Sequence, residues 1–260
     1  MNSLENLQTL NSAESANEIL CAALDLGEHI LRNGGEIHRV EDTIERVCNH
    51  FGAAHVEVFA IPTLIISSVR LENGDFSHQI RRIKDTGNNL SLLEDLNSIS
   101  RRLCAGEIKL SEVRPEILAA KGKKVYPKWV LGVSNMFAAG GFAVFFGGTL
   151  IDGLVAAVIG ILMMAFSYLL PKYINKMISI LVSATFGGLL AVFSSKLGLC
   201  ENLDMVMIGT VMLLIPGVAI SNAIRDMLGG EAISGALELL QALLLALMIA
   251  AGYAIALLLI

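Results

Sequence analysis

The second half of the chain is a succession of long hydrophobic stretches without a charged residue. They are Trp129–Ile151, Gly153–Leu170, Met177–Ser195, Met205–Ile224 and Leu239–Ile260. As an α-helix, even the shortest of them would extend roughly 27 Å, close to the ~30 Å thickness of the hydrocarbon core of a bilayer. The pattern therefore predicts five transmembrane helices in a domain that covers residues 126–260.

The first half has the shorter, amphipathic patterns of a folded domain outside the bilayer. Hydrophobic residues recur every three or four positions in the segments 19–30 and 37–51, which predicts two helices. Asn11 and Glu14 resemble the capping box of the first helix. Strands are predicted at His55–Ile61, Thr63–Val69 and Phe76–Ile83, and further helices at Asn89–Ala105 and Ser111–Ala120. Residues 1–125 thus read as an α+β domain long enough to fold independently.

Charge is concentrated in the same first half. Residues 1–128 hold 15 of the 19 Lys and Arg, 18 of the 24 Asp and Glu, and all five His. A net charge of -5 without a basic stripe argues against nucleic acid as the main partner. The four cysteines form no CxxC pair and are interpreted as reduced thiols. Since the N-terminus lacks the features of a signal peptide, we expect the first domain to be cytoplasmic.

The positions of the basic residues predict the orientation of the hydrophobic stretches. Those expected on the cytoplasmic side are Lys121, Lys123, Lys124, Lys128, Lys172, Lys176 and Arg225. The opposite side receives Asp152 and the acidic 201–204 connection. The positive-inside rule then places the N-terminus in the cytoplasm and the C-terminus outside, in the periplasm if the membrane is a bacterial inner membrane.

Pro216 and Gly217 interrupt the fourth stretch. Proline removes a backbone donor, and a broken helix inside a membrane is typical of transport sites, because freed backbone groups can face a polar substrate. An ordinary proline kink would leave the same sequence pattern. Asn222 and Asp226 follow at the expected cytoplasmic mouth.

Two further polar residues, Asn135 and Asp152, lie in or beside the first hydrophobic stretch. Carboxylates at the membrane are costly and are commonly tied to proton or substrate movement, although Asp152 could equally be a solvated loop residue. We predict a substrate pathway that consists of Asn135, Asp152, Pro216, Gly217, Asn222 and Asp226.

The first domain contains no sequence motif of an enzyme. His38 and Asp42 are one helical turn apart and could form a metal site or an acid–base pair, but no HExxH, Walker A, GxSxG or GxGxxG motif accompanies them. Ion pairs on a solvated helix face are the simpler interpretation. We therefore expect no metal ion, no other cofactor and no catalysis. Without a nucleotide-binding loop, an ion gradient is the default energy source for transport.

Two sequence blocks resemble the threonine/serine exporter family, and more narrowly its short, YjjP-like members. The first block is 34–44, with Gly34, Gly35, Glu36, His38, Arg39, Glu41 and Asp42. The second is Ile215–Asp226, followed by Gly229–Gly235; the segment Phe146–Gly148 with Asp152 adds to the match.

This resemblance implies a multi-pass exporter of small polar metabolites in the inner (plasma) membrane of a bacterium. Its cargo would be threonine and serine or a dicarboxylate such as succinate. The short form implies a small companion membrane subunit in a homo- or hetero-oligomer, which agrees with an odd number of spans, since a five-span chain has the topology of one half of an inverted repeat. The alternatives are a membrane-anchored enzyme and an assembly or regulatory subunit that acts through the cytoplasmic domain.

Overall fold

The chain divides into two compact units in a computed structural model that describes residues 15–123, 126–171 and 174–259. The α+β unit comprises Met1–Lys123 with Val218–Leu239, and the helical unit comprises Lys124–Gly217 with Leu240–Ile260. Asn11 and Glu14, the predicted capping box, lie outside the described residues.

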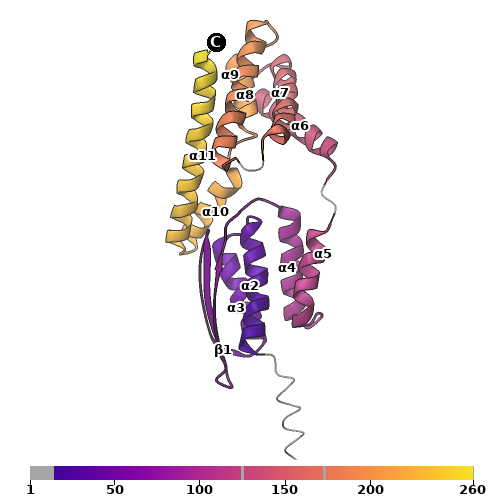
Figure 1. Ribbon diagram of the computed structural model, residues 1–260. Coiled ribbons are helices and arrows are strands. Elements are labelled where there is room, and N and C mark those ends of the chain that lie inside the picture. Colours follow the sequence, from indigo (N-terminus) through magenta and orange to yellow (C-terminus); the bar gives the residue numbers. More distant parts are fainter. Residues whose placement is uncertain (1–14, 124–125, 172–173, 260) are drawn as a thin grey trace, which may run out of the picture. The chain divides into compact units, whose positions relative to one another are not determined.

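A three-stranded antiparallel sheet and four α-helices of the first half form most of the α+β unit (Figure 1). The strands are β1 (Ala53–Ile61), β2 (Leu64–Leu71) and β3 (Phe76–Arg82), in the order β1-β2-β3. The helices are α2 (Ala16–Arg32), α3 (Ile37–His50), α4 (Leu90–Cys104) and α5 (Val113–Lys121), with a 3-10 turn η1 (Leu110–Glu112) before α5. The elements that periodicity predicted are therefore present.

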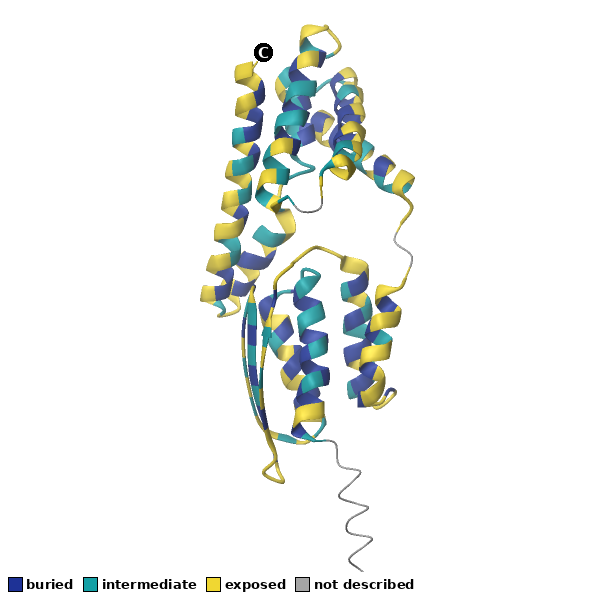
Figure 2. Cartoon of the chain, viewed as in Figure 1, coloured by how far each residue is buried: buried dark blue, intermediate teal, exposed yellow. Residues whose placement is uncertain are grey.

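Helices α2 and α3 are amphipathic, and each is stabilised by burying its apolar face. Ile19, Leu20, Val40 and Ile44 are fully buried, and they join one core with residues of β2 and α4 (Figure 2). At the N-terminus of α2, Ser15 forms a capping box with Glu18, which satisfies backbone donors of the first turn.

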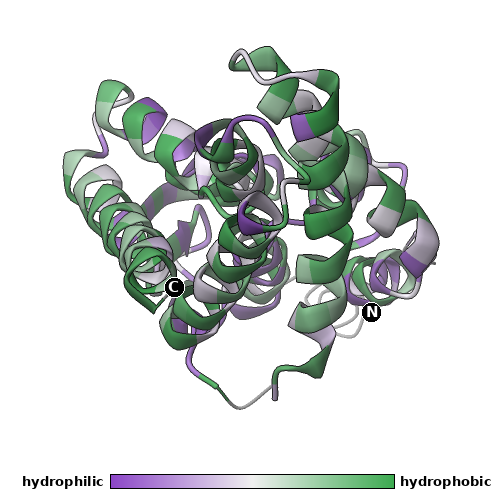
Figure 3. Ribbon diagram, turned by 90° about the horizontal axis from the view of Figure 1, so that it is seen from above, coloured by the Kyte–Doolittle hydropathy of each residue, from purple (hydrophilic) through white to green (hydrophobic). Residues whose placement is uncertain are grey.

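The helical unit contains α6 (Lys128–Phe145), α7 (Leu150–Leu169), α8 (Lys176–Lys196) and α9 (Leu203–Val211), and the part of α11 (Ala232–Leu259) that begins at Leu240. Hydrophobic residues dominate these helices (Figure 3). Helix α9 approaches α6 closely at Gly209, where a Cβ atom would lie 2.4 Å from the carbonyl oxygen of Ala139. Close contact between small residues is how helices pack in lipid, where the hydrophobic effect does not drive them together.

The prediction of five membrane-spanning helices is not confirmed. Within the described residues, four helices are long and apolar enough to cross a bilayer: α6, α7, α8 and α11. The predicted helix 205–224 is instead split into α9 and α10 (Gly217–Leu228). Pro216 has no N–H to continue the ladder, and Gly217 donates its N–H to the carbonyl of Ile215 at 2.9 Å in a tight turn.

Candidate functional site

The two sequence blocks meet inside the α+β unit, where α10 contacts the N-terminus of α3. Asp226 is 1% exposed and accepts hydrogen bonds from the backbone N–H groups of Ile37 at 3.2 Å and His38 at 3.4 Å. Glu36, the N-cap residue of α3, makes no side-chain capping bond of its own. Since the first N–H groups of a helix have no partner within the helix, Asp226 caps α3 from a distant part of the sequence.

Two neighbours of Asp226 on α10 extend this contact. The side-chain amide of Asn222, which is 7% exposed, donates to the carbonyl of Gly34 at 3.0 Å. Arg225 forms an ion pair with Glu36. Because residues three and four positions apart lie on one face of a helix, all three side chains reach the start of α3 together. We call this contact the α3 clamp: Asn222, Arg225 and Asp226 on Gly34, Glu36, Ile37 and His38.

The glycine pair before α3 is explained by the turn that leads into the clamp. Gly34 has a φ of +91°, a left-handed conformation that glycine adopts without strain. At Gly35, a Cβ atom would lie 2.4 Å from a side-chain carbon of Ile30 and 2.9 Å from its carbonyl oxygen. A larger residue at Gly35 would push against Ile30 of α2, and one at Gly34 would meet the side chain of Asn88.

Several carboxyl groups surround the clamp. Burial raises the pKa of Asp226, the two backbone N–H groups lower it, and the nearby charges of Glu36 and Glu231 raise it again. The carboxylate of Glu238 on α11 also interacts electrostatically with Asp226, and its Oε2 atom is buried without a hydrogen-bond partner in the described part of the chain. Asp226 thus has few donors for a buried carboxyl group.

Glu41 and Ser234 both attach to Ala60 of β1. The Glu41 carboxylate accepts from the backbone N–H of Ala60 at 2.7 Å, and the Ser234 hydroxyl donates to the Ala60 carbonyl at 2.7 Å. Burial raises the pKa of Glu41 to about 7, with Glu231 adding to the shift and the Ala60 N–H opposing it. Ser234 stands in the quoted Gly229–Gly235 segment, but sequence reasoning did not select it.

The other residues of the first block do not enter this contact through their side chains. His38, Arg39 and Asp42 are exposed, and Asp42 pairs with Arg46 one turn along α3 at 3.3 Å. Within the described residues, no group of three or more His, Cys, Asp or Glu has the geometry of a metal site.

Asp152 lies in the helical unit and is completely buried. It accepts from the N–H and hydroxyl of Thr149 at 2.9 and 3.0 Å, which caps α7. It also accepts from the N–H of Glu201 at 2.8 Å and from the backbone and side-chain amides of Asn202, both at 3.0 Å. The sequence left open whether Asp152 is solvated; it instead ties the start of α7 to the connection before α9.

The remaining pathway candidates are distributed over both units. Asn135 is half-buried on α6, while Pro216 and Gly217 make the interruption between α9 and α10. Asn135 and Asp152 belong to the helical unit, and Asn222 and Asp226 belong to the α+β unit. The predicted approach of these two pairs stays a prediction.

A buried hydroxyl pair in the helical unit escaped the sequence reasoning. Tyr253 of α11 donates to the hydroxyl oxygen of Thr210 on α9 at 2.9 Å, and the two residues are 6% and 0% exposed. Gly187 and Gly188 of α8 leave the space that the tyrosine ring occupies. The available signal was two isolated hydroxyl side chains within hydrophobic stretches.

Long hydrophobic helices combined with an interrupted segment are typical of membrane transport proteins. The family model ThrE, described as "Putative threonine/serine exporter", matches residues 22–260, which is nearly the whole chain. The chain therefore belongs to the threonine/serine exporter family, a family of transporters rather than enzymes. No curated protein and no solved structure matches it.

Proposed function

We propose that the chain is the larger subunit of a two-component exporter that moves threonine and serine out of a bacterial cell, driven by an ion gradient. The α3 clamp is the observation that carries this proposal, because it joins both sequence blocks of the family at one contact. That contact holds α10, the element that directly follows the interrupted segment.

The proposed topology has five crossings, one of which is only partly helical. Helical turns continue from Leu203 to Leu214, and Ile215 and Pro216 are not helical. These turns extend roughly 18 Å, about two thirds of the ~30 Å hydrocarbon core, and the non-helical turn that follows continues the crossing. Non-helical backbone at this depth is tolerated where protein or a water-filled cavity surrounds it. Together with the basic residues at the proposed cytoplasmic side, five crossings put the N-terminus inside and the C-terminus outside.

In the proposed mechanism, the clamp controls the interrupted segment. While Asn222 and Asp226 hold α10 against α3, the position of the chain after Gly217 is fixed. Release of α10 would let this segment move, and its unpaired backbone groups would then bind the polar cargo. Alternating access requires two such discrete arrangements, and a capping contact that forms or breaks supplies them.

A proton is the coupling ion we propose, and Asp226 is its carrier. A buried carboxyl group with a raised pKa binds a proton more readily than an exposed one. Protonation removes the negative charge that favours the N-terminus of α3, so it weakens the clamp. Deprotonation restores the negative charge and with it the clamp, so the position of α10 is linked to proton release.

The exposed surface of α6 favours the presence of a second membrane subunit. Only 17% of the α6 span is buried inside the chain, compared with 39% of the spans of α7 and α8. A helix that is apolar but little covered by its own chain offers its face to lipid or to another protein. We assign this face to the small companion subunit.

Export from loaded cells that lack their own exporters tests the proposal. The chain is expressed alone and then with the membrane protein encoded beside it, and labelled threonine, serine and succinate are followed with and without a protonophore. Export of threonine and serine by the pair only, abolished by the protonophore, is the expected result.

Three outcomes would contradict separate parts of this proposal. Export by this chain alone would remove the two-component arrangement, and export of succinate only would replace the cargo. Export that survives the protonophore would remove the proton. Asp226→Asn tests the clamp directly, with the exposed Asp42→Asn of the same unit as the matched control.

A further inference from the structure

A cleft in the α+β unit, away from the α3 clamp, has the features of a small-molecule site. It lies between α2 and the η1–α5 segment and has a volume of about 470 Å³, within the range of roughly 300–1,000 Å³ that small-molecule pockets occupy. Its lining includes Asn17, Cys21 and Asp25 from α2 and Ser111 and Arg114 from the opposite wall.

The two walls of this cleft carry opposite charges. Glu18 and Asp25 lie on the α2 wall, whereas Lys109 and Arg114 lie on the facing wall. A ligand with only negative groups would meet the two carboxylates, and one with only positive groups would meet the two cations. A small zwitterion satisfies both walls at once.

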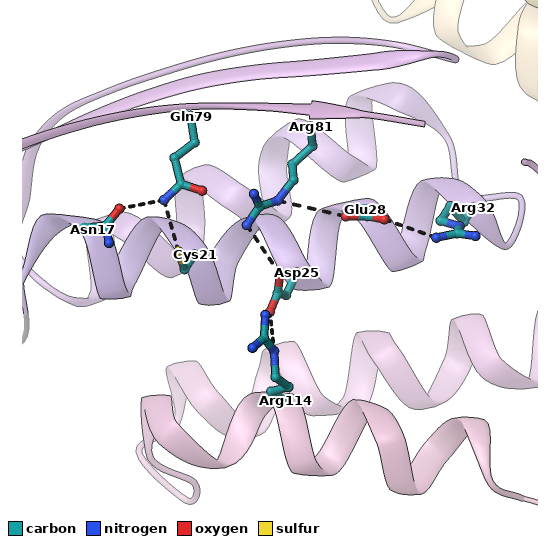
Figure 4. Close-up of polar contacts among 8 residues, drawn as sticks. All are labelled: Asn17, Cys21, Asp25, Glu28, Arg32, Gln79, Arg81 and Arg114. Carbon is teal, nitrogen blue, oxygen red and sulfur yellow. Dashed lines mark hydrogen bonds and ion pairs between the residues drawn. The ribbon is translucent and has the colours of Figure 1, made fainter. Parts of the chain in front are cut away.

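The Asp25 carboxylate is held firmly enough to serve as a fixed anchor. Figure 4 shows Asp25 on α2 between Arg81 of β3 and Arg114 of α5. Arg81 remains 3.6 Å from Asp25 on the sheet side, and only 18% of the Asp25 side chain is exposed. Asp25 therefore keeps one cationic partner even when the other one moves.

Arg114 is the movable member of this arrangement. Its Nε atom lies 3.2 Å from Asp25, but 75% of its side chain is exposed, and such exposed pairs contribute little stability. The guanidinium can turn to bind a ligand carboxylate with two parallel hydrogen bonds, which are stronger than neutral ones. Asp25 would then accept from the ligand's ammonium group.

The rest of the lining suits a short, polar side chain. Ser111 brings a hydroxyl group, while Ala22, Leu110 and Val113 supply apolar surface. The amide oxygen of Asn17 is fixed by Gln79 of β3 at 2.8 Å, as Figure 4 also shows.

We propose that this cleft binds a free α-amino acid with a small side chain and so senses the cytoplasmic level of the cargo class. The choice of ligand class rests on the proposed function, because an exporter benefits from a site that responds to the concentration of its cargo. The site itself rests on the charges and volume of the cleft.

Cys21 makes binding measurable in the full chain. It lines the cleft and is partly exposed. Cys48 is fully buried, and burial raises the pKa of its thiol to about 12, so it reacts slowly. Replacement of the two other partly exposed cysteines, Cys104→Ser and Cys200→Ser, leaves Cys21 as the reactive thiol.

The experiment follows the rate at which a maleimide alkylates Cys21 in this purified full chain. L-threonine or L-serine, added up to about 10 mM to cover weak binding, should slow the reaction several-fold. N-acetyl-L-threonine lacks the ammonium, threoninol lacks the carboxylate and succinate has two carboxylates; none of them should protect. Arg114→Gln should raise the threonine concentration for half-protection about tenfold. Arg101→Gln, an exposed arginine on α4 outside the cleft, should leave it unchanged.

Equal protection by succinate, or no protection by either amino acid, would overturn the inference. So would protection that persists unchanged in both Arg114→Gln and Asp25→Asn. The assay needs neither the companion subunit nor transport. If the two-subunit pair exports threonine but the purified chain does not bind it, only the sensing site is rejected. If the chain binds threonine but the pair does not export it, only the proposed function is rejected.

Discussion

Asp152 and Asp226 are both buried carboxylates that bind backbone N–H groups from a distant segment, yet their surroundings differ. Asp152 has five hydrogen bonds from Thr149, Glu201 and Asn202. Asp226 has two, and other carboxyl groups lie near it. A carboxylate with all its acceptor positions filled is held in one place, whereas a buried one with few donors can exchange its proton more readily.

This difference separates two roles that sequence reasoning had grouped in one pathway. The surroundings of Asp152 favour a permanent contact that fixes the N-terminus of α7. Those of Asp226 favour a contact that forms and breaks. The predictions below test this contrast, from the largest expected effect to the smallest.

Asp152→Ala should have the largest effect. It should lower the stability of the protein and not transport alone. It leaves the N–H groups of Glu201 and Asn202 without a buried acceptor, which we expect to destabilise the helical unit by about 3–5 kcal/mol. The amount of folded protein in the membrane, measured by detergent extraction and gel filtration, should fall sharply. Asp204→Asn, an exposed acidic residue of α9, is the control. Normal levels of folded Asp152→Ala protein would contradict the role of this permanent contact.

Asp226→Asn should reduce export by more than about tenfold while the protein accumulates normally, because one lost capping bond costs only about 1 kcal/mol. Hydrogen exchange should speed up at the first turn of α3. Export is measured with the proposed companion subunit present, at matched protein levels. Normal export by Asp226→Asn would remove this carboxyl group from the mechanism.

The stability of the α+β unit should fall as pH rises towards neutrality. Burial raises the pKa of Glu41 from its ordinary value of 4.5 to about 7, so the folded chain binds the proton more tightly than the unfolded chain between these values. Stability therefore declines as pH rises through this window. Hydrogen exchange of β1, corrected for the intrinsic effect of pH, measures the slope.

Glu41→Gln should flatten that slope, because glutamine does not titrate. The control is Glu57→Gln, which changes an exposed residue of β1 and should leave the slope unchanged. A slope that is the same in Glu41→Gln and in the unsubstituted chain would show that another group is responsible.

Arg225→Gln should have the smallest effect. The Arg225 side chain is 65% exposed, and such ion pairs contribute about 0–1 kcal/mol. Export should stay within about twofold of the unsubstituted chain, because Asn222 and Asp226 still hold α10. A loss as large as that of Asp226→Asn would mean that the pair with Glu36 is the principal contact of the clamp.

The elements of the α+β unit were predictable because each has a local signal. Ile19 to Ile30 and Ile37 to Phe51 repeat with helical spacing, and the turn at Asn73-Gly74 separates β2 from β3. The end of the helix at Pro216 was also predictable, since proline lacks the donor. The count of five spanning helices is not confirmed: four helices of the described residues are long and apolar enough, because hydropathy measures apolar length and not helical continuity.

The contacts between distant residues were not predictable. Nothing local to Asp226 indicates that it caps α3, and nothing local to Asp152 indicates that the amides of Glu201 and Asn202 meet it. The pairing of Tyr253 with Thr210 and the cleft at Asp25 likewise depend on elements far apart in the chain.

The sequence by itself determined the division into a charged half and an apolar half, the helices and strands, the interrupted segment and the family. These follow from local preferences and from the partition of side chains between water and lipid, which act on neighbouring residues. Only the tertiary structure decided what each buried polar group binds. A carboxylate buried away from water requires donors, and packing of the whole unit selects which distant N–H groups supply them.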